Sequence, residues 1–88
     1  MIKLWGKIIT NNKIVCQDVV ICSETFEYEE ELKKCIIQLC YKFDIQKPYW
    51  LRKNQLEYNK IKKTVFTQDN FIEEISYDKL EIEVLEEK

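Results

Sequence analysis

The sequence lacks histidine and alanine altogether, and it contains a single glycine and a single proline. Without histidine the chain cannot use Ser-His-Asp or Cys-His catalysis, a histidine-ligated metal or a histidine pH switch. Because Gly6 is its only glycine, the chain also cannot form the glycine-rich fingerprint of a dinucleotide site or a P-loop. We therefore expect a protein that is not an enzyme, with no catalytic residue and no cofactor.

Long apolar runs are missing as well, and the longest one covers only residues 19–22. A transmembrane helix needs about 20 apolar residues and a signal-peptide core needs about 7–15. We therefore expect a cytoplasmic location and no membrane partner. The net charge is −2 and the isoelectric point is about 5.2, so overall charge does not attract the protein to nucleic acid or anionic lipid.

The chain of 88 residues has the length of one small domain, and no linker, repeat or low-complexity segment divides it. A chain of this size buries only roughly 60–65 % of the surface that its unfolded form exposes. A standard protein interface, about 800 Å² on each partner, fits on such a domain more readily than an enclosed active site does. We therefore expect a single domain over residues 1–88.

Four cysteines are present, with the spacings C-x5-C and C-x4-C: Cys16, Cys22, Cys35 and Cys40. Neither spacing matches the C-x2-C pair of zinc ribbons and thioredoxin-like motifs. In a reducing cytosol the favoured interpretation is four free thiols that pack as small apolar side chains. Metal binding and disulfide formation are the alternatives.

Residues 1–22 have the pattern of a β-hairpin with its turn at Asn11-Asn12, because asparagine tolerates the positive φ of a type I′ turn. Regular pairing about this turn places Leu4 opposite Val19. The face that carries Leu4 is apolar nearly throughout, so we expect it to be the core face. Its members are Ile2, Leu4, Gly6, Ile8, Val15, Gln17, Val19 and Ile21.

Residues 25–43 have the apolar spacing of an amphipathic helix, with Ser23 or Thr25 as its cap. A second helix is expected over residues 48–61, because Pro48 suits the first position of a helix. The apolar stripe of the first helix comprises Tyr28, Leu32, Cys35, Ile36, Leu39 and Phe43. That of the second comprises Trp50, Leu51, Tyr58 and Ile61, with Asn54 as an interruption.

Two strands are expected after the helices, over residues 64–67 and 80–84, with an irregular acidic segment over residues 71–78 between them. The resulting order, β-β-α-α-β-β, predicts an α+β fold. We expect an antiparallel or mixed sheet with both helices packed on one face. We also expect the last strand to lie beside the first.

The second face of the predicted hairpin is mixed, and it carries the first candidate site. Regular pairing places Cys16 and Cys22 on this face together with four apolar side chains, Trp5, Ile9, Ile14 and Val20. If no helix covers the face, these four form an exposed apolar patch with a tryptophan at its centre. The patch favours a non-catalytic interaction domain that binds a protein partner or forms a homo-oligomer.

A basic segment over residues 47–63 carries the alternative, nucleic-acid binding. It contains six cations and one acid, Glu57, and clustered cations with exposed aromatic rings bind phosphates and stacked bases. The candidate contacts are Tyr49, Arg52, Lys53, Lys60 and Lys63. The competing interpretation is a solvated helix face whose lysines lie over apolar surface.

Acidic residues are concentrated in the last twenty positions, which contain eight acidic residues and two lysines. Asp69, Glu73 and Glu74 are oxygen ligands of the kind that Mg²⁺ or Ca²⁺ prefers. The segment lacks the alternating ligands and central glycine of an EF-hand loop, so we favour a solvated acidic surface and assign no metal ligand.

Three stretches, Leu4–Ile9 (LWGKII), Pro48–Asn54 (PYWLRKN) and Phe66–Ile72 (FTQDNFI), resemble a group of short uncharacterised proteins from low-GC Gram-positive bacteria. With the closing strand at 80–84, the resemblance covers most of the chain. It implies a bacterial, cytoplasmic protein with a compact domain of mixed helices and strands. No motif of the group is tied to an activity, so the resemblance implies no catalytic or binding residue.

Overall fold

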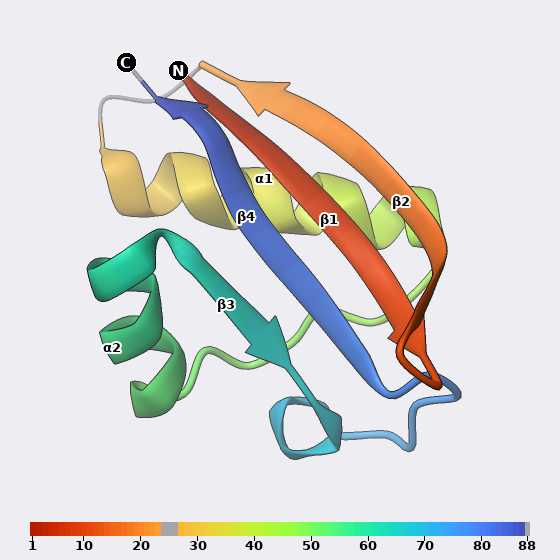
Figure 1. Ribbon diagram of the computed structural model, residues 1–88. Coiled ribbons are helices and arrows are strands. Elements are labelled where there is room, and N and C mark those ends of the chain that lie inside the picture. The colour runs from red at the N-terminus through yellow and green to blue at the C-terminus, as the bar shows by residue number, and fades with distance from the viewer. Residues whose placement is uncertain (24–26, 88) are drawn as a thin grey trace.

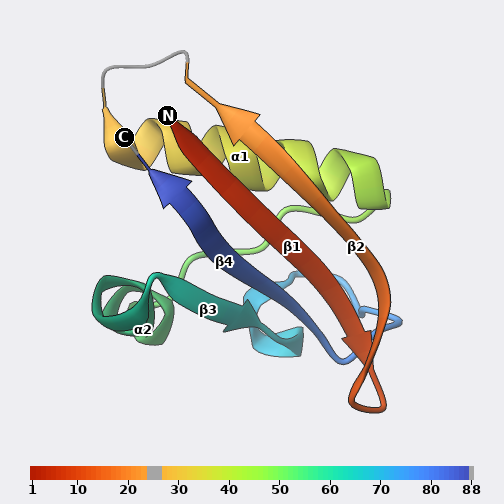
Figure 2. The same ribbon diagram turned by 45° about the horizontal axis from the view of Figure 1, so that its top comes forward.

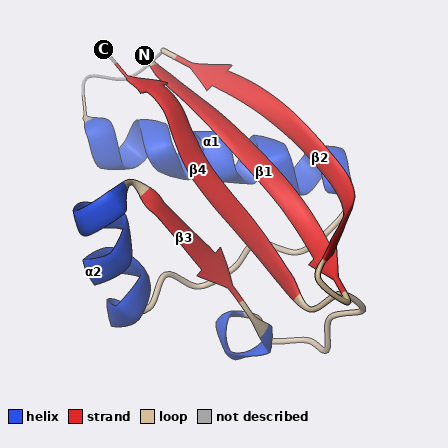
Figure 3. Ribbon diagram, viewed as in Figure 1, coloured by secondary structure: helices blue, strands red, loops and turns tan. Residues whose placement is uncertain are grey.

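A computed structural model describes residues 1–23 and 27–87 of the chain (Figure 1). Two strands come first, two helices follow, and the remaining strands close the chain, so the predicted order and the α+β class are confirmed (Figure 3). The elements are β1 (Ile2–Thr10), β2 (Lys13–Cys22), α1 (Tyr28–Phe43), α2 (Arg52–Ile61), β3 (Lys63–Phe66), the 3₁₀ helix η1 (Gln68–Asn70) and β4 (Lys79–Glu87).

The four strands of the described residues form one antiparallel sheet in the order β2-β1-β4-β3. The last strand lies beside the first, as predicted. Helix α1 crosses one face of this sheet, and α2 lies next to β3 (Figures 1 and 2). The buried side chains of both helices join those of the strands in a single core. Among the described residues, neither α-helix combines the length and the hydrophobicity that a membrane-spanning helix requires.

The predicted hairpin turn is confirmed, because Asn11 and Asn12 have φ values of 54° and 63°. A contact with the segment before β4 holds the turn in place. The backbone N–H of Asn11 donates to Oδ2 of Asp78 at 2.8 Å, and the N–H of Asp78 donates to the carbonyl of Ile9 at 3.0 Å.

The pairing of β1 with β2 differs from the regular register predicted above. Ile9 lies opposite Ile14, but Ile8 lies opposite Cys16, which leaves Val15 as the extra residue of a β-bulge. From this point on, every residue of β2 is shifted by one place relative to the prediction. A shift of one residue exchanges the two faces of a strand.

The bulge brings Val20 opposite Leu4 and Cys22 opposite Ile2, so both lie on the core face. Our placement of Cys16, Val20 and Cys22 on the mixed face was therefore wrong. The end of β2, Val19-Val20-Ile21-Cys22, is apolar on both faces, so hydrophobic alternation does not select the register here.

The core face of β1 is the one predicted, because Ile2, Leu4 and Ile8 are buried against α1. Gly6 allows the close approach of that helix. A Cβ atom at Gly6 would lie 2.8 Å from Cδ1 of Leu39, which is itself fully buried. The buried positions of α1 follow the predicted stripe, with Glu31 and Cys40 added on its flanks.

The two helices begin later than predicted. Helix α1 begins at Tyr28 instead of residue 25, and the proposed cap Thr25 lies outside the described residues. Helix α2 begins at Arg52, so placing Pro48 at the first helical position was wrong. The segment before it is not helical, and the N–H of Tyr49 donates to the carbonyl of Asn70 at 2.6 Å.

The side chain of Asn54 explains where α2 begins. Its Oδ1 accepts the N–H of Leu51 at 3.0 Å, while its Nδ2 donates to Oγ1 of Thr64 at 2.9 Å and to the carbonyl of Val65 at 2.8 Å. A second buried amide, Asn70, donates to Oδ1 of Asn54 at 2.8 Å. The residue that interrupts the predicted apolar stripe therefore joins α2, β3 and η1.

Candidate functional site

The outer face of the sheet, opposite the helices, holds the first candidate surface. By the observed register, β1 contributes Trp5 and Lys7 to this face, and β4 contributes Glu81 and Glu83. Trp5 is half-buried and held from two sides. Its Nε1–H donates to Oε1 of Gln17 at 3.0 Å, and Nζ of Lys7 lies 3.8 Å from its ring centroid.

Charges on this outer face compensate one another. Nζ of Lys7 lies 2.5 Å from Oε2 of Glu81 and 3.8 Å from Oε1 of Glu83, and Lys7 is almost wholly buried by its neighbours. On β3, Nζ of Lys63 lies 3.8 Å from the same Glu83 oxygen. The centre of the face is thus an aromatic ring among paired charges.

The predicted interface residues are divided between the two faces. Trp5 is half-buried on the outer face, and Ile14 pairs with Ile9 and is 48 % exposed. Val20 is only 4 % exposed in the core, so its assignment to the candidate interface was wrong. Its neighbours in β2 replace it on the outer face, since Val19 and Ile21 are 38 % and 58 % exposed.

The five predicted nucleic-acid contacts do not form one surface. Tyr49 lies in the segment before α2, and Arg52 and Lys53 occupy the first turn of that helix. Lys60 lies in its last turn. Lys63 belongs to β3, where it pairs with Glu83 on the outer face of the sheet.

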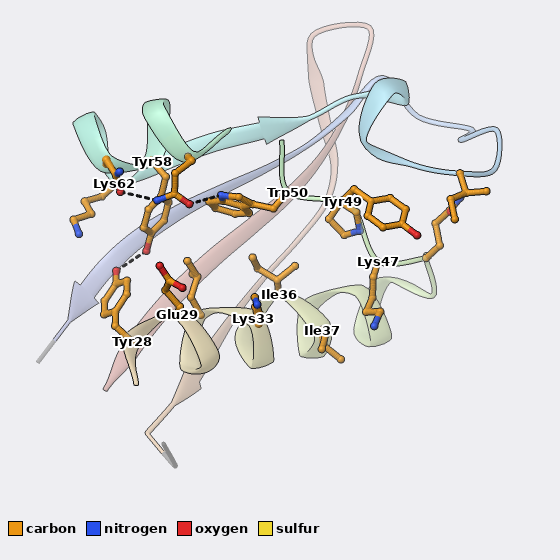
Figure 4. Close-up of a pocket in the computed structure, with 16 residues that line it drawn as sticks. Tyr28, Glu29, Lys33, Ile36, Ile37, Lys47, Tyr49, Trp50, Tyr58 and Lys62 are labelled. Carbon is orange, nitrogen blue, oxygen red and sulfur yellow. Dashed lines mark hydrogen bonds between the residues drawn. The ribbon is translucent and has the colours of Figure 1, made fainter. Parts of the chain in front are cut away.

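A groove between α1 and α2, with a volume of about 800 Å³, is the second candidate surface (Figure 4). One wall is α1, and the other is formed by residues 46–50 together with α2. Buried or half-buried apolar side chains line it: Leu32, Ile36, Trp50 and Tyr58. The groove was not expected from the sequence, because these four residues belong to the apolar stripes of the two predicted helices and were assigned only to the core.

One end of the groove is closed by a polar cluster. The hydroxyl oxygens of Tyr28 and Tyr58 are 2.5 Å apart, and the Tyr28 hydroxyl donates to Oε2 of Glu87 at 2.6 Å. Nζ of Lys62 lies 3.6 Å from Oε1 of Glu87 and 5.1 Å from the Tyr28 ring centroid. The ammonium group of Lys62 is therefore already engaged by Glu87 and Tyr28 of the same chain.

The two tyrosines of this cluster are not set up as bases. Burial raises the pKa of Tyr58 to about 12. Burial, followed by the hydrogen bond to Glu87, raises the pKa of Tyr28 well above its usual range. Both hydroxyls are therefore neutral donors at physiological pH, which suits a structural or binding role.

The opposite end of the groove carries Lys47 and Tyr49, and Trp50 lies between the two ends (Figure 4). The Trp50 indole is held in place, since its Nε1–H donates to Oε1 of Gln55 at 2.8 Å. Its ring packs against Tyr58 and Phe66, with centroid distances of 5.6 and 5.5 Å.

The cysteines are free thiols, and only Cys16 is exposed. Burial raises the pKa of the Cys40 thiol to about 11, and burial together with the neighbouring Cys22 raises that of Cys35. Such thiols are poor nucleophiles. Within residues 1–23 and 27–87, no three side chains of the metal-ligating types lie close enough together to hold a metal ion. Asp69, Glu73 and Glu74 therefore do not form such a group.

Comparison with known proteins adds no relative, since no protein-family model, no curated protein and no solved structure matches this chain.

Proposed function

We propose that this protein is a non-catalytic interaction domain and that the outer face of its sheet binds a protein partner. The observation that carries the proposal is the placement of the helices on the opposite face, which leaves Trp5 beside the exposed side chains of Val19 and Ile21. A tryptophan within an apolar patch is typical of the centre of a protein interface.

The outer face fits a second copy of the same chain. Along β1 it carries the cations Lys3 and Lys7, and along the neighbouring β4 it carries acids, including Glu86, which lies opposite Lys3 in the register. The edge strand β2 adds Val19 and Ile21, while the other edge, β3, adds Val65. The outer face therefore carries both the cations and the acids that two copies would need in order to pair their charges.

A two-fold axis parallel to the strands, between β1 and β4, uses this complementarity. Rotation about it stacks β1 of each copy on β4 of the other, and β2 on β3. Lys3 of one copy then lies over Glu86 of the other, Lys7 lies over Glu81, and Gln17 of the edge strand β2 lies over Val65 of β3. Packed sheets keep their strands within about 30° of one another, which such an arrangement satisfies.

Charge reversal tests this arrangement. We expect sedimentation of the unchanged protein to show dimers that dissociate on dilution. Lys3→Glu and Glu86→Lys each place like charges across the two-fold axis, so each variant alone should be monomeric. An equimolar mixture should dimerise again, since each new charge then meets its opposite. Lys34→Glu on the exposed side of α1 is the control and should change nothing.

The indole resonances report which surface is used. The Trp5 indole N–H should shift with protein concentration, whereas that of Trp50 in the groove should not. Trp5→Ala should abolish the dimer while retaining the circular dichroism spectrum of the folded chain. A protein that stays monomeric up to millimolar concentration, or a dimer that is indifferent to both charge reversals, would show the proposal to be wrong.

A further inference from the structure

The groove between α1 and α2 is a second surface, separate from the outer face of the sheet. It is formed in advance by contacts within the chain. The Tyr28–Tyr58 hydroxyl contact bridges its walls at one end, and the hydrogen bond from Trp50 to Gln55 fixes the indole. On the 46–50 side, the Gln46 side chain donates to the carbonyl of Glu73 at 3.2 Å. A ligand therefore loses little free energy in ordering this site.

The apolar surface of the groove continues over its rim. Tyr49 is 58 % exposed, Ile37 is 45 % exposed, and Ile72 is 76 % exposed. Small-molecule pockets of about 300–1,000 Å³ bury most of their ligand inside a concave wall. A small molecule inside the groove would leave these rim side chains in water. An α-helix, about 10–12 Å in diameter, can place side chains in a groove and on its rim at the same time.

The charge of the lining is positive. Three lysines and one acid, Glu29, line the groove. Lys62 is already bound to Glu87. Lys33 and Lys47 form no ion pair with any of the described residues, and both are exposed. Two cations that lie beside an apolar groove attract a ligand with carboxylates on either side of an apolar stripe.

We propose that the groove binds an acidic amphipathic helix of a protein partner. The apolar stripe of this helix packs on Trp50 and Ile36, and glutamates or aspartates beside the stripe pair with Lys33 and Lys47. This is the helix-in-groove mode of recognition, read through apolar anchors at i, i+3, i+4 and i+7. It gives the interaction domain a second partner, independent of its self-association.

A selection experiment tests the chemistry without a known partner. The probe is a phage-displayed library of helical peptides of about 16 residues, roughly 24 Å long. Leucine is fixed at the four anchor positions, and the other positions vary among Glu, Lys, Gln and Ala. We expect selection on the unchanged protein to enrich Glu beside the leucine stripe. Enrichment of Lys there, or no charge preference, overturns the proposal.

A matched pair of variants locates the binding site. The double variant Lys33→Glu and Lys47→Glu should weaken binding of the selected peptide by about tenfold or more. The double variant Lys53→Glu and Lys60→Glu changes the net charge equally on α2 but outside the groove, and it should have little effect. Equal loss in both double variants would mean that overall charge, and not the groove, drives binding.

The two indoles provide the second readout. Titration with the peptide should shift the Trp50 indole N–H and leave that of Trp5 unchanged, and the reverse result overturns the assignment. Dodecanoate and a 15-nucleotide oligothymidylate are titrated in the same way. If either one shifts Trp50 at a lower concentration than every selected peptide, the groove binds a lipid-like anion or a nucleic acid instead, and the proposal is wrong.

Discussion

At the scale of single residues, two buried asparagines hold the second half of the molecule together. Asn54 and Asn70 are 1 % and 0 % exposed, yet their amides have partners on both the oxygen and the nitrogen. A buried polar side chain is tolerated only when its hydrogen bonds are satisfied, and a partly satisfied network is costly. These amides therefore determine the position of α2 against β3.

Replacing Asn54 by alanine should lower the free energy of unfolding by about 2–4 kcal/mol, because the buried amide of Asn70 and the hydroxyl of Thr64 lose a partner. Urea denaturation measures the change. Asn59→Ala, an exposed amide on the same helix, is the control and should change stability by less than about 0.5 kcal/mol. Equal effects of the two substitutions would remove the special role of Asn54.

Single residues also show where sequence reasoning succeeds and where it stops. Asn11-Asn12 was recognisable as a turn because its signal is local, a positive φ at two adjacent positions. Asn54 was visible only as a gap in an apolar stripe. Its partners Thr64 and Asn70 are distant in the sequence, and no local pattern indicates such a network.

At the scale of elements, the bulge at Val15 decides which side chains of β2 enter the core. The unpaired residue moves Val20 and Cys22 inward and turns Val19 and Ile21 outward. The composition of the outer face, and with it the proposed interface, therefore depends on one inserted residue that is itself 62 % exposed.

Deletion of Val15 should be tolerated, with a change in unfolding free energy within about 1 kcal/mol. The shortened hairpin keeps Ile9 opposite Ile14 and Ile8 opposite Cys16, so the rest of β2 retains its register. Thiol titration provides the readout, since Cys22 should stay protected in the folded protein. Val15→Ala, which retains the bulge, is the reference. Loss of several kcal/mol, or exposure of Cys22, would contradict this register.

Whole elements were predicted more reliably than their pairing. The helix predicted over residues 25–43 and the strand predicted over residues 80–84 followed from periodicity, because each has one apolar face, and they correspond to α1 and β4. The start of α2 was missed, since Pro48 fits a helix start but Asn70 holds the next residue, Tyr49, in a non-helical segment. The groove was missed for a related reason. The groove lies between α1 and α2, and the distance between two helices depends on the tertiary packing and not on a local sequence pattern.

At the scale of the whole molecule, the core keeps buried cysteine thiols and tyrosine hydroxyls in their protonated, neutral form. Burial raises the pKa of Cys40 from 9.0 to about 11 and that of Tyr58 from 10.0 to about 12. The unfolded chain therefore releases these protons at a lower pH than the folded chain does. Their contribution to stability is fully present below the unfolded pKa values and is lost as the pH rises towards the folded ones.

The free energy of unfolding should accordingly fall above about pH 9, by up to about 1.4 kcal/mol per pH unit for each such group. Urea denaturation at a series of pH values measures the slope. Tyr58→Phe removes one of these groups, so the decline above pH 10 should become shallower. Tyr41→Phe, at a side chain that is 87 % exposed, should leave the decline unchanged. A stability that stays constant up to pH 11 would contradict the burial of these groups.

The central position of β1 between β2 and β4 has a consequence for biosynthesis. Ile2 pairs with Glu87 across the sheet, so β1 completes its hydrogen bonding only with a strand that is translated well after the hairpin. At roughly 5–20 residues per second, the nascent hairpin waits for several seconds with one edge of β1 unpaired. During that interval the nascent chain exposes a strand edge that is paired in the folded protein, and an exposed edge of this kind can pair with strands of other chains.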